Sequence, residues 1–177
     1  NKLGITVSGD INSRNNMWKY GKTMQEIIPE LVKHSDVVIT SSRGIREMFH
    51  IGEMDDSFKS LAKELIKEYP NVKKVVKKTR RIISASHHQI QGKIYNGKTY
   101  IKSEMLNITH IIDRVGTGDA FAAGLIYGLL HYKDDEAIEF ASAACALKHT
   151  IPGDVNMVSL ENVQSLMQGN ISGAIKR

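Results

Sequence analysis

The sequence predicts an α/β fold with a mainly parallel sheet that helices cover on both faces. Short strand patterns alternate with helical patterns along the chain. The segment at residues 36–40 has an apolar centre, as a buried parallel strand does. The chain has 177 residues, 41% of them hydrophobic, which is enough for a hydrophobic core. We see no internal repeat, low-complexity stretch or linker, so we expect a single domain over residues 1–177.

The first part of the chain is expected to alternate strands with helices. Alternating or apolar runs predict strands at residues 3–8, 36–40 and 72–77. Apolar residues at helical spacing predict helices at residues 21–33, 43–49 and 56–69. Pro29 falls inside the first of these helices, where we expect a kink or a restart.

The second part contains an antiparallel insert. Residues 82–105 form two alternating runs around Asn96-Gly97, which is a strong signal for a two-residue hairpin turn. A further strand is predicted at residues 108–112. Helices are predicted at residues 118–130, 134–148 and 158–167. Small residues in the first of these helices are expected to let it pack close to the sheet.

The turn Gly116-Thr117-Gly118-Asp119 lies between a predicted strand and a predicted helix. Glycines let the backbone turn tightly, and the first amides of a helix cannot bond within it, so they form a site for anions. A carboxylate at Asp119 would repel a bound phosphate, unless it accepts a proton from a hydroxyl that attacks the phosphate. The turn therefore indicates phosphoryl transfer. The alternative is an ordinary turn in which Asp119 only caps the helix.

Two other nucleotide-binding patterns are excluded. A dinucleotide-binding Gly-x-Gly-x-x-Gly pattern would need glycine where Phe121 stands. Residues 92–99 match the P-loop pattern letter for letter, but a P-loop must open a helix and this segment is predicted to be a hairpin. We therefore interpret that match as accidental.

Three segments carry a resemblance to a known family. Residues 115–124 (Val-Gly-Thr-Gly-Asp-Ala-Phe-Ala-Ala-Gly) resemble the C-terminal signature of the ribokinase/PfkB carbohydrate kinases. Residues 10–18 (Asp-Ile-Asn-Ser-Arg-Asn-Asn-Met-Trp) and 146–154 resemble segments of that family's 2-keto-3-deoxygluconate (2-dehydro-3-deoxygluconate) kinases. The likeness covers nearly the whole chain but only the C-terminal part of a family member. It implies a ribokinase-like three-layer fold, N-terminally truncated, without the β-lid that the family's other half supplies.

The resemblance implies an ATP-dependent kinase that converts 2-keto-3-deoxygluconate to its 6-phosphate, with ATP and Mg²⁺ as cofactors. It implies that Asp119 is the catalytic base and also contacts the substrate. The amides of Gly116, Thr117 and Gly118 are the implied anion hole.

Substrate contacts are implied for Asn12, Arg14 and Asp154. In an extended chain Asn12 and Arg14 project to one face, and a planar guanidinium suits a carboxylate, which favours a sugar acid. A surface ion pair is the alternative for Arg14. The resemblance places Lys78, Thr79 and Arg80 near the nucleotide phosphates and Ser142 near the adenine.

One segment departs from the family pattern. Residues 41–44 read Ser-Ser-Arg-Gly, where the family usually has Asn-Glu and further acidic residues that organise Mg²⁺. No metal-ligating residue is therefore assigned. Two alternatives stay open: a kinase for a neutral sugar of the fructose or ribose type, and a truncated, catalytically inactive remnant that binds nucleotide or another subunit.

The expected partners are a small-molecule sugar acid and ATP, with a homo-oligomer as a further possibility. The net charge of +5 does not indicate nucleic acid, because the basic run at residues 73–81 has no interleaved aromatic residues. No apolar run is long enough to span a membrane. A single cysteine, Cys145, fits a reducing cytoplasm, which is the expected location.

Overall fold

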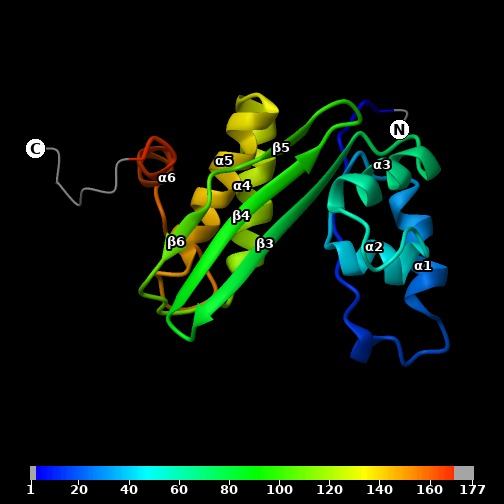
Figure 1. Cartoon of the computed structure of the whole chain (residues 1–177), viewed down its shortest axis with the longest axis horizontal. Coiled ribbons are helices and arrows are strands. Elements are labelled where there is room, and N and C mark those ends of the chain that lie inside the picture. Colours follow the sequence, from blue (N-terminus) through cyan, green and yellow to red (C-terminus); the bar gives the residue numbers. More distant parts are fainter. Residues whose placement is uncertain (1–2, 170–177) are drawn as a thin grey trace, which may run out of the picture. The chain divides into compact units, whose positions relative to one another are not determined.

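The computed structural model describes residues 3–169 (Figure 1). Its strands are β1 (Ser8–Asp10), β2 (Val37–Ile39), β3 (Lys74–Ser84), β4 (His87–Tyr95), β5 (Tyr100–Lys102) and β6 (Leu106–Ile108). Its helices are the 3-10 helix η1 (Asn15–Met17), α1 (Met24–Val32), α2 (Ser42–Phe49), α3 (Phe58–Glu68), α4 (Thr117–His131), α5 (Asp134–Lys148) and α6 (Leu160–Met167).

The chain divides into two compact units. Unit 1 holds the residues up to 78 together with 93–101, and unit 2 holds 79–92 together with the residues from 102 onward. Strands β3 and β4 contribute to both units. The expectation of one domain over the whole chain stays a prediction.

The strands form a mixed sheet in the order β1-β2-β3-β4-β5, and β6 pairs with β4. Strands β1, β2 and β3 are parallel neighbours, with Val38 opposite Gly9 on one side and Val75 on the other. Strand β6 runs antiparallel to β4, with Leu106 opposite Ile90. The prediction of an α/β fold with parallel strands and an antiparallel insert is confirmed.

Two strand boundaries were predicted wrongly. The strand expected at residues 3–8 begins only at Ser8, because the chain runs beside the three-residue β2 over residues 8–10. The strand expected at residues 108–112 is β6, which ends at Ile108. After it the backbone turns away, and the amide of Ile112 donates a hydrogen bond of 2.8 Å to the carbonyl of His149.

The hairpin formed by β3 and β4 is longer than the sequence pattern indicates. Strand β3 continues without a break from residue 74 to residue 84, and a turn at residues 85–86 leads into β4 (Figure 1). Ala85 and Ser86 give no strong turn signal, so the pattern could not locate this reversal. The hairpin predicted around Asn96-Gly97 is confirmed, with Gly97 at a φ of 84°, but residues 96–99 join β4 to β5 instead of two residues.

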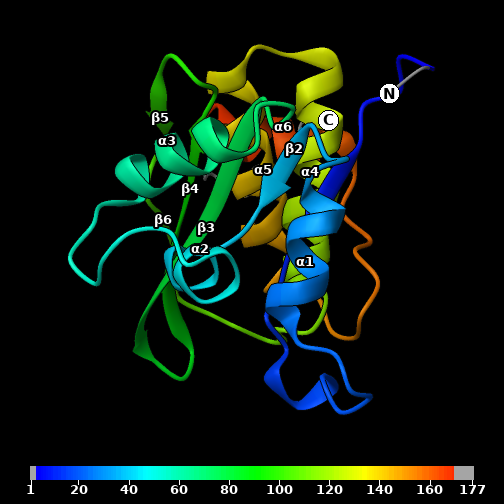
Figure 2. The same ribbon diagram turned by 90° about the vertical axis from the view of Figure 1, so that its right-hand side faces the viewer.

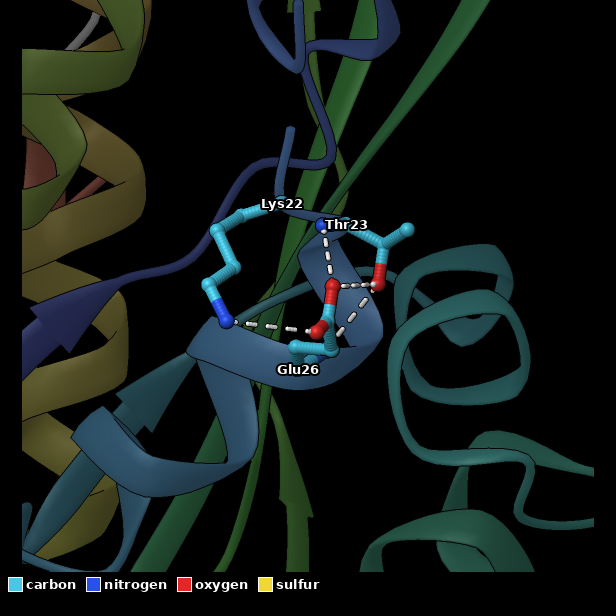
Figure 3. Close-up of polar contacts among 3 residues, drawn as sticks. All are labelled: Lys22, Thr23 and Glu26. Atoms are coloured by element: carbon cyan, nitrogen blue, oxygen red, sulfur yellow. Dashed lines mark hydrogen bonds and ion pairs between the residues drawn. The ribbon is translucent and has the colours of Figure 1, made fainter. Parts of the chain in front are cut away.

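Helix α1 begins with a capping box that the sequence reasoning did not identify (Figure 3). Oε2 of Glu26 accepts hydrogen bonds from the amide and the hydroxyl of Thr23, at 2.7 and 3.0 Å. These bonds, together with Lys22, hold the pKa of Glu26 below its usual value. The restart predicted at Pro29 is wrong, since the helix runs through that residue to Val32. A proline removes one backbone donor, and the capped first turn and the buried Ile28 and Val32 keep the helix in place.

The core of unit 1 lies between its helices and strands β2 and β3. Fully or almost fully buried side chains include Val32, Val38, Ile45, Leu61, Leu65 and Val75. Helix α3 lies within the helix predicted at residues 56–69, and it buries Phe58, Leu61 and Leu65. Burial of each such side chain contributes roughly 1.5–3 kcal/mol to folding.

In unit 2, helices α4 and α5 lie side by side (Figure 1). A Cβ at Gly124 would lie 3.0 Å from Cβ of Ala144, and one at Gly128 would lie 2.8 Å from Cα of Ala137. The small residues of α4 therefore let it approach α5, whereas the sequence reasoning assigned this close packing to the sheet. Cys145 is buried within α5, as expected. Among residues 3–169, no helix combines the length and the apolar character needed to cross a bilayer.

Candidate active site

The turn that precedes α4 has the backbone that its glycines predicted. Gly116 caps the helix in the left-handed region, with φ 72° and ψ −1°, and its carbonyl accepts the first helical bond from the amide of Ala120 at 2.8 Å. The amide of Thr117 makes a long bond of 3.4 Å to the carbonyl of Arg114, and its hydroxyl donates to the same oxygen at 3.0 Å. These two bonds from Thr117 to Arg114 thus hold the turn in shape.

The space beside the start of α4 is open. In the described part of the chain the amides of Gly116 and Gly118 donate no hydrogen bond. A Cβ added at Gly118 would meet no atom within 4 Å. Free amides at the positive end of a 15-residue helix, with room in front of them, form a site for an oxyanion.

Asp119 is the third residue of α4, and its side chain is exposed. Its carboxylate accepts no hydrogen bond within residues 3–169, so it is available to a ligand. A carboxylate in the first turn interacts favourably with the helix dipole.

Asp154 lies beside this turn. A Cβ at Gly116 would overlap the carbonyl oxygen of Asp154 and would lie 2.9 Å from its Oδ1. The structure thereby brings together Gly116 and Asp154, which are 38 residues apart in the chain and which the sequence reasoning had placed in one site.

Two residues hold these segments together, and the sequence reasoning missed both. Oδ1 of Asp113 accepts from the amides of Arg114 and Val115 at 2.6 and 3.0 Å, and its Oδ2 accepts from the amide of Gly153 at 2.8 Å. The bonds from Val115 and Gly153, followed by that from Arg114, hold the pKa of Asp113 below its usual value. An aspartate side chain commonly accepts a bond from the amide two residues on, and this tendency could have identified Asp113 at the turn.

Lys148 is the second of these residues. It has no exposed surface, and its Nζ donates to the carbonyls of Ile151 and Gly153 at 3.1 and 2.6 Å. A buried polar group needs such hydrogen-bond partners to offset its loss of contact with water. The side chain of Lys148 therefore holds the loop that carries Asp154.

In unit 1, Asn12 and Arg14 lie on the loop between β1 and α1, which Figure 2 shows extending beyond the end of α1. Both side chains are exposed. Arg14 has φ 39° and ψ 55°, the left-handed region that non-glycine residues seldom adopt. The indole of Trp18 donates a hydrogen bond of 2.6 Å to the carbonyl of Ser13 and fastens the loop.

Of the four residues expected near the nucleotide, three lie in β3 and one lies in α5. Lys78, Thr79 and Arg80 are consecutive in β3, so Thr79 projects to the face opposite the other two. Ser142 is fully buried in α5, and its hydroxyl bonds with the amide of Gly92, Oγ of Ser103 and the carbonyl of Ile138. That hydroxyl is occupied inside unit 2, and we leave it out of the proposed nucleotide site.

No group of three or more histidine, cysteine, aspartate or glutamate side chains gathers at metal-binding distance within residues 3–169. In residues 41–44, which depart from the family pattern, Ser41 caps α2 through a bond of 2.9 Å from the amide of Gly44. Ser42 accepts a bond of 2.8 Å from Nζ of Lys77. These residues offer hydroxyls and cations rather than carboxylates. They do not fit a resident Mg²⁺.

Known proteins resemble this chain over most of its length. Residues 6–160 match the model of the pfkB family of carbohydrate kinases. A 2-dehydro-3-deoxygalactonokinase from Haloferax volcanii is 27% identical over 173 residues, which are 97% of this chain and 50% of that protein.

Solved structures show the same relationship. The 2-dehydro-3-deoxygluconokinase of Thermotoga maritima is 34% identical with a TM-score of 0.85, over 95% of this chain and 51% of that one. A PfkB family carbohydrate kinase from Listeria grayi is 29% identical, also with a TM-score of 0.85, over 94% and 51%. The chain thus spans about half the length of these relatives. Its ribokinase-like fold and its matched segment show that it belongs to the pfkB family of carbohydrate kinases.

Proposed function

We propose that this chain takes part in ATP-dependent phosphorylation of a 2-keto-3-deoxy sugar acid, with 2-keto-3-deoxygluconate converted to its 6-phosphate as the first choice. The observation that carries the proposal is the start of α4, where open amides and the unpartnered, exposed Asp119 occupy the same helical turn. The names of two relatives, a 2-dehydro-3-deoxygalactonokinase and a 2-dehydro-3-deoxygluconokinase, support a sugar acid of this class.

In this proposal Asp119 accepts the proton of the attacking hydroxyl, and the oxygen of that hydroxyl attacks the γ-phosphorus of ATP. The bond from the γ-phosphorus to the oxygen that bridges it to the β-phosphorus breaks, and ADP leaves. The amides of Gly116 and Gly118 stabilise the charge on the transferring phosphoryl group, and Thr117 holds the turn in shape. Asp154 contacts the sugar acid beside the same turn. Mg²⁺ that arrives with ATP would neutralise phosphate charge.

Arg14 and Asn12 are proposed to bind the substrate. The guanidinium of Arg14 presents paired donors that match a carboxylate, so it selects a sugar acid over a neutral sugar. Lys78, Thr79 and Arg80 are proposed to contact the nucleotide. A cytoplasmic location and a homo-oligomer complete the proposal, and cell fractionation and light scattering test them.

A coupled assay of ADP release tests this function. Wild type and Asp119→Asn are compared with 2-keto-3-deoxygluconate, 2-keto-3-deoxygalactonate, fructose and ribose as acceptors. Loss of the general base is expected to lower kcat by about 10²–10⁴-fold, because an amide cannot accept the proton. Turnover of fructose or ribose alone would replace the sugar-acid assignment with the neutral-sugar one. Arg14→Ala is expected to reduce turnover of the sugar acids selectively, so an unchanged rate contradicts the assignment.

One observation favours a second candidate. Residues 41–44 lack the carboxylates with which the family organises Mg²⁺, so the second candidate is a chain that binds nucleotide or another subunit without transferring phosphate. This candidate predicts no sugar-dependent ADP release above the Asp119→Asn control, together with retained ATP binding by calorimetry.

A further inference from the structure

A second arginine lies at the loop that carries Arg14. Within unit 1 a hollow of about 580 Å³ is lined by Ser13, Arg14, Asn15, Asn16, Met17 and Arg43. Two of these six residues are cationic and none is acidic. Arg43 comes from the start of α2, 29 positions along the chain from Arg14, and the sequence reasoning gave it no role in binding.

The backbone around Arg14 is fixed in an unfavourable conformation. Arg14 is one of two non-glycine residues with a positive φ in the described range. The amide of Met17 donates to the carbonyl of Arg14 at 2.8 Å, and the indole of Trp18 bonds to Ser13. Strain that neighbouring bonds maintain is often found where a side chain must be presented to a ligand.

Only one nitrogen of the Arg43 guanidinium is bonded to a neighbouring side chain within residues 3–169. Its Nε donates to Oε1 of Glu47, one helical turn further along α2, while 73% of its side chain remains exposed. The two Nη groups donate to no partner among residues 3–169. Glu47 therefore anchors the guanidinium and leaves its two terminal nitrogens available. An arginine presents these nitrogens in a fixed fork that matches two oxygens of a carboxylate or a phosphate.

The surroundings of α2 add positive charge. Nζ of Lys77 donates to Oγ of Ser42, the residue before Arg43, and burial, followed by the charges of Lys93 and Arg46, lowers the pKa of Lys77. A cation beside Ser42 favours the approach of an anion to the start of α2.

We propose that Arg43 is a second oxyanion-binding residue, which acts with Arg14 to hold an anionic group of a small-molecule ligand in this hollow. The choice of ligand rests on the proposed function, which offers two sources of the same chemistry: the carboxylate of a sugar acid and the phosphates of ATP. Residues 41–44 supply the guanidinium of Arg43 to this hollow, where the family usually has carboxylates that organise Mg²⁺. In this proposal the segment therefore binds an anion instead of organising a metal ion.

Binding in the absence of turnover tests the proposal. Trp18 is the only tryptophan of the chain and follows directly on the lining residue Met17, so its fluorescence reports on the hollow. Calorimetry and Trp18 fluorescence are recorded for wild type, Arg43→Ala, Arg43→Lys and Arg46→Ala. The titrants are 2-keto-3-deoxygluconate, ATP and, as an uncharged reference, fructose. Arg46→Ala is the matched control, because it removes the same charge from the same helix at a residue that does not line the hollow.

Arg43→Ala is expected to weaken binding of one anion by about 10-fold or more, the effect of a lost charge-assisted hydrogen bond. Arg43→Lys is expected to be intermediate, since it keeps the charge and loses the fork, and Arg46→Ala is expected to stay within about 2-fold. An effect on the sugar acid identifies the carboxylate as the occupant, and an effect on ATP identifies the phosphates.

Several results would overturn the proposal. These are affinities within about 2-fold of wild type for both anions in Arg43→Ala, an equal loss in Arg46→Ala, or no anion binding by wild type. Circular dichroism and melting curves show whether the variants fold, and Arg43→Lys preserves the test if Arg43→Ala does not. Failure of the proposed function is distinct: anion binding would still depend on Arg43, and no sugar-dependent ADP would be released.

Discussion

The backbone of Gly116 lies directly against the carbonyl oxygen of Asp154, with no room for a Cβ between them. This contact joins the turn at the start of α4 to the loop after α5. It explains why glycine stands at this position, since φ is 72° and the space is also filled.

Gly116→Ala is therefore expected to destabilise the protein by about 1–3 kcal/mol and to lower sugar-dependent turnover at least about 10-fold. The cause is the combined cost of a positive φ and of displacing Asp154. Chemical denaturation and the ADP assay measure the two effects.

Gly118→Ala is the matched control, because its Cβ would meet no atom within 4 Å. Its stability is expected to equal that of wild type or to rise slightly, as alanine favours a helix over glycine. Its turnover is expected to fall if the transferring phosphoryl group occupies that open space. Equal stability losses in the two variants would contradict this account of Gly116.

Asp113→Ala is expected to reduce kcat by about 10–100-fold, because the loss of its three backbone bonds releases the turn from Gly153. Asp113→Asn is expected to lie between wild type and alanine, since its carbonyl can accept from one segment while its NH₂ group cannot accept from the other. Steady-state kinetics, with melting curves as the folding control, check this order. Wild-type activity in Asp113→Ala would show that the bonds do not position the site.

The lowered pKa of Asp113 gives a pH prediction for the same turn. Because the folded protein holds the carboxylate below its ordinary pKa of 3.8, the stability that it contributes is present above that pH and is lost as the pH falls through the folded value. Under acidic conditions, the melting temperature should therefore fall less steeply with decreasing pH for Asp113→Ala than for wild type.

Ser142→Ala is expected to destabilise the protein by about 1–3 kcal/mol, because the amide of Gly92 and the hydroxyl of Ser103 lose a buried partner. The KM for ATP is expected to be unchanged, since the Ser142 hydroxyl is enclosed within unit 2. Ser84→Ala, at the exposed end of β3, is the control and should leave stability unchanged. A raised KM for ATP with normal stability would restore the nucleotide role first expected for Ser142.

His88 predicts a further pH effect. It is fully buried in β4, and neither ring nitrogen has a hydrogen-bond partner among the described residues. Burial, then the charges of Arg80 and Arg114, and last His87, lower its pKa from 6.5. The ring of His149 faces it edge-on at 6.0 Å. The folded state thus keeps His88 neutral, whereas the unfolded chain takes up a proton below about pH 6.5.

The stability of wild type is therefore expected to fall as the pH is lowered from about 7.5 to about 5.5, and that of His88→Phe to fall less. Thermal melting at several pH values measures the difference. His34→Gln, at an exposed position, is the control and should behave as wild type. An equal pH dependence in His88→Phe would assign the effect to other groups.

Much of the local structure follows from short stretches of sequence. The helix that starts after Gly116, the buried strand around Val38 and the turn at Asn96-Gly97 were predicted from patterns within a few residues. Such features depend on backbone geometry and on apolar spacing, which neighbouring residues determine. The turn that precedes Asp119 belongs to this group, and it indicated phosphoryl transfer before any fold was known.

Other features depend on segments that are distant in the sequence. The reversal at residues 85–86, the close contact of α4 with α5, and the continuation of α1 through Pro29 all arise from packing that no local pattern specifies. The same holds for the burial of Ser142, whose place near the adenine stays a prediction.

The sequence by itself determined the family chemistry, because the glycines, the helix start and Asp119 are consecutive and shape one another directly. Only the tertiary structure decided which distant residues hold the turn in place and which further residue is proposed to bind the ligand. Asp113 reaches an amide 40 residues away, and Arg43 lines the same hollow as Arg14. Contacts of this kind exist only once the chain has folded, since folding is what brings distant segments within hydrogen-bonding distance.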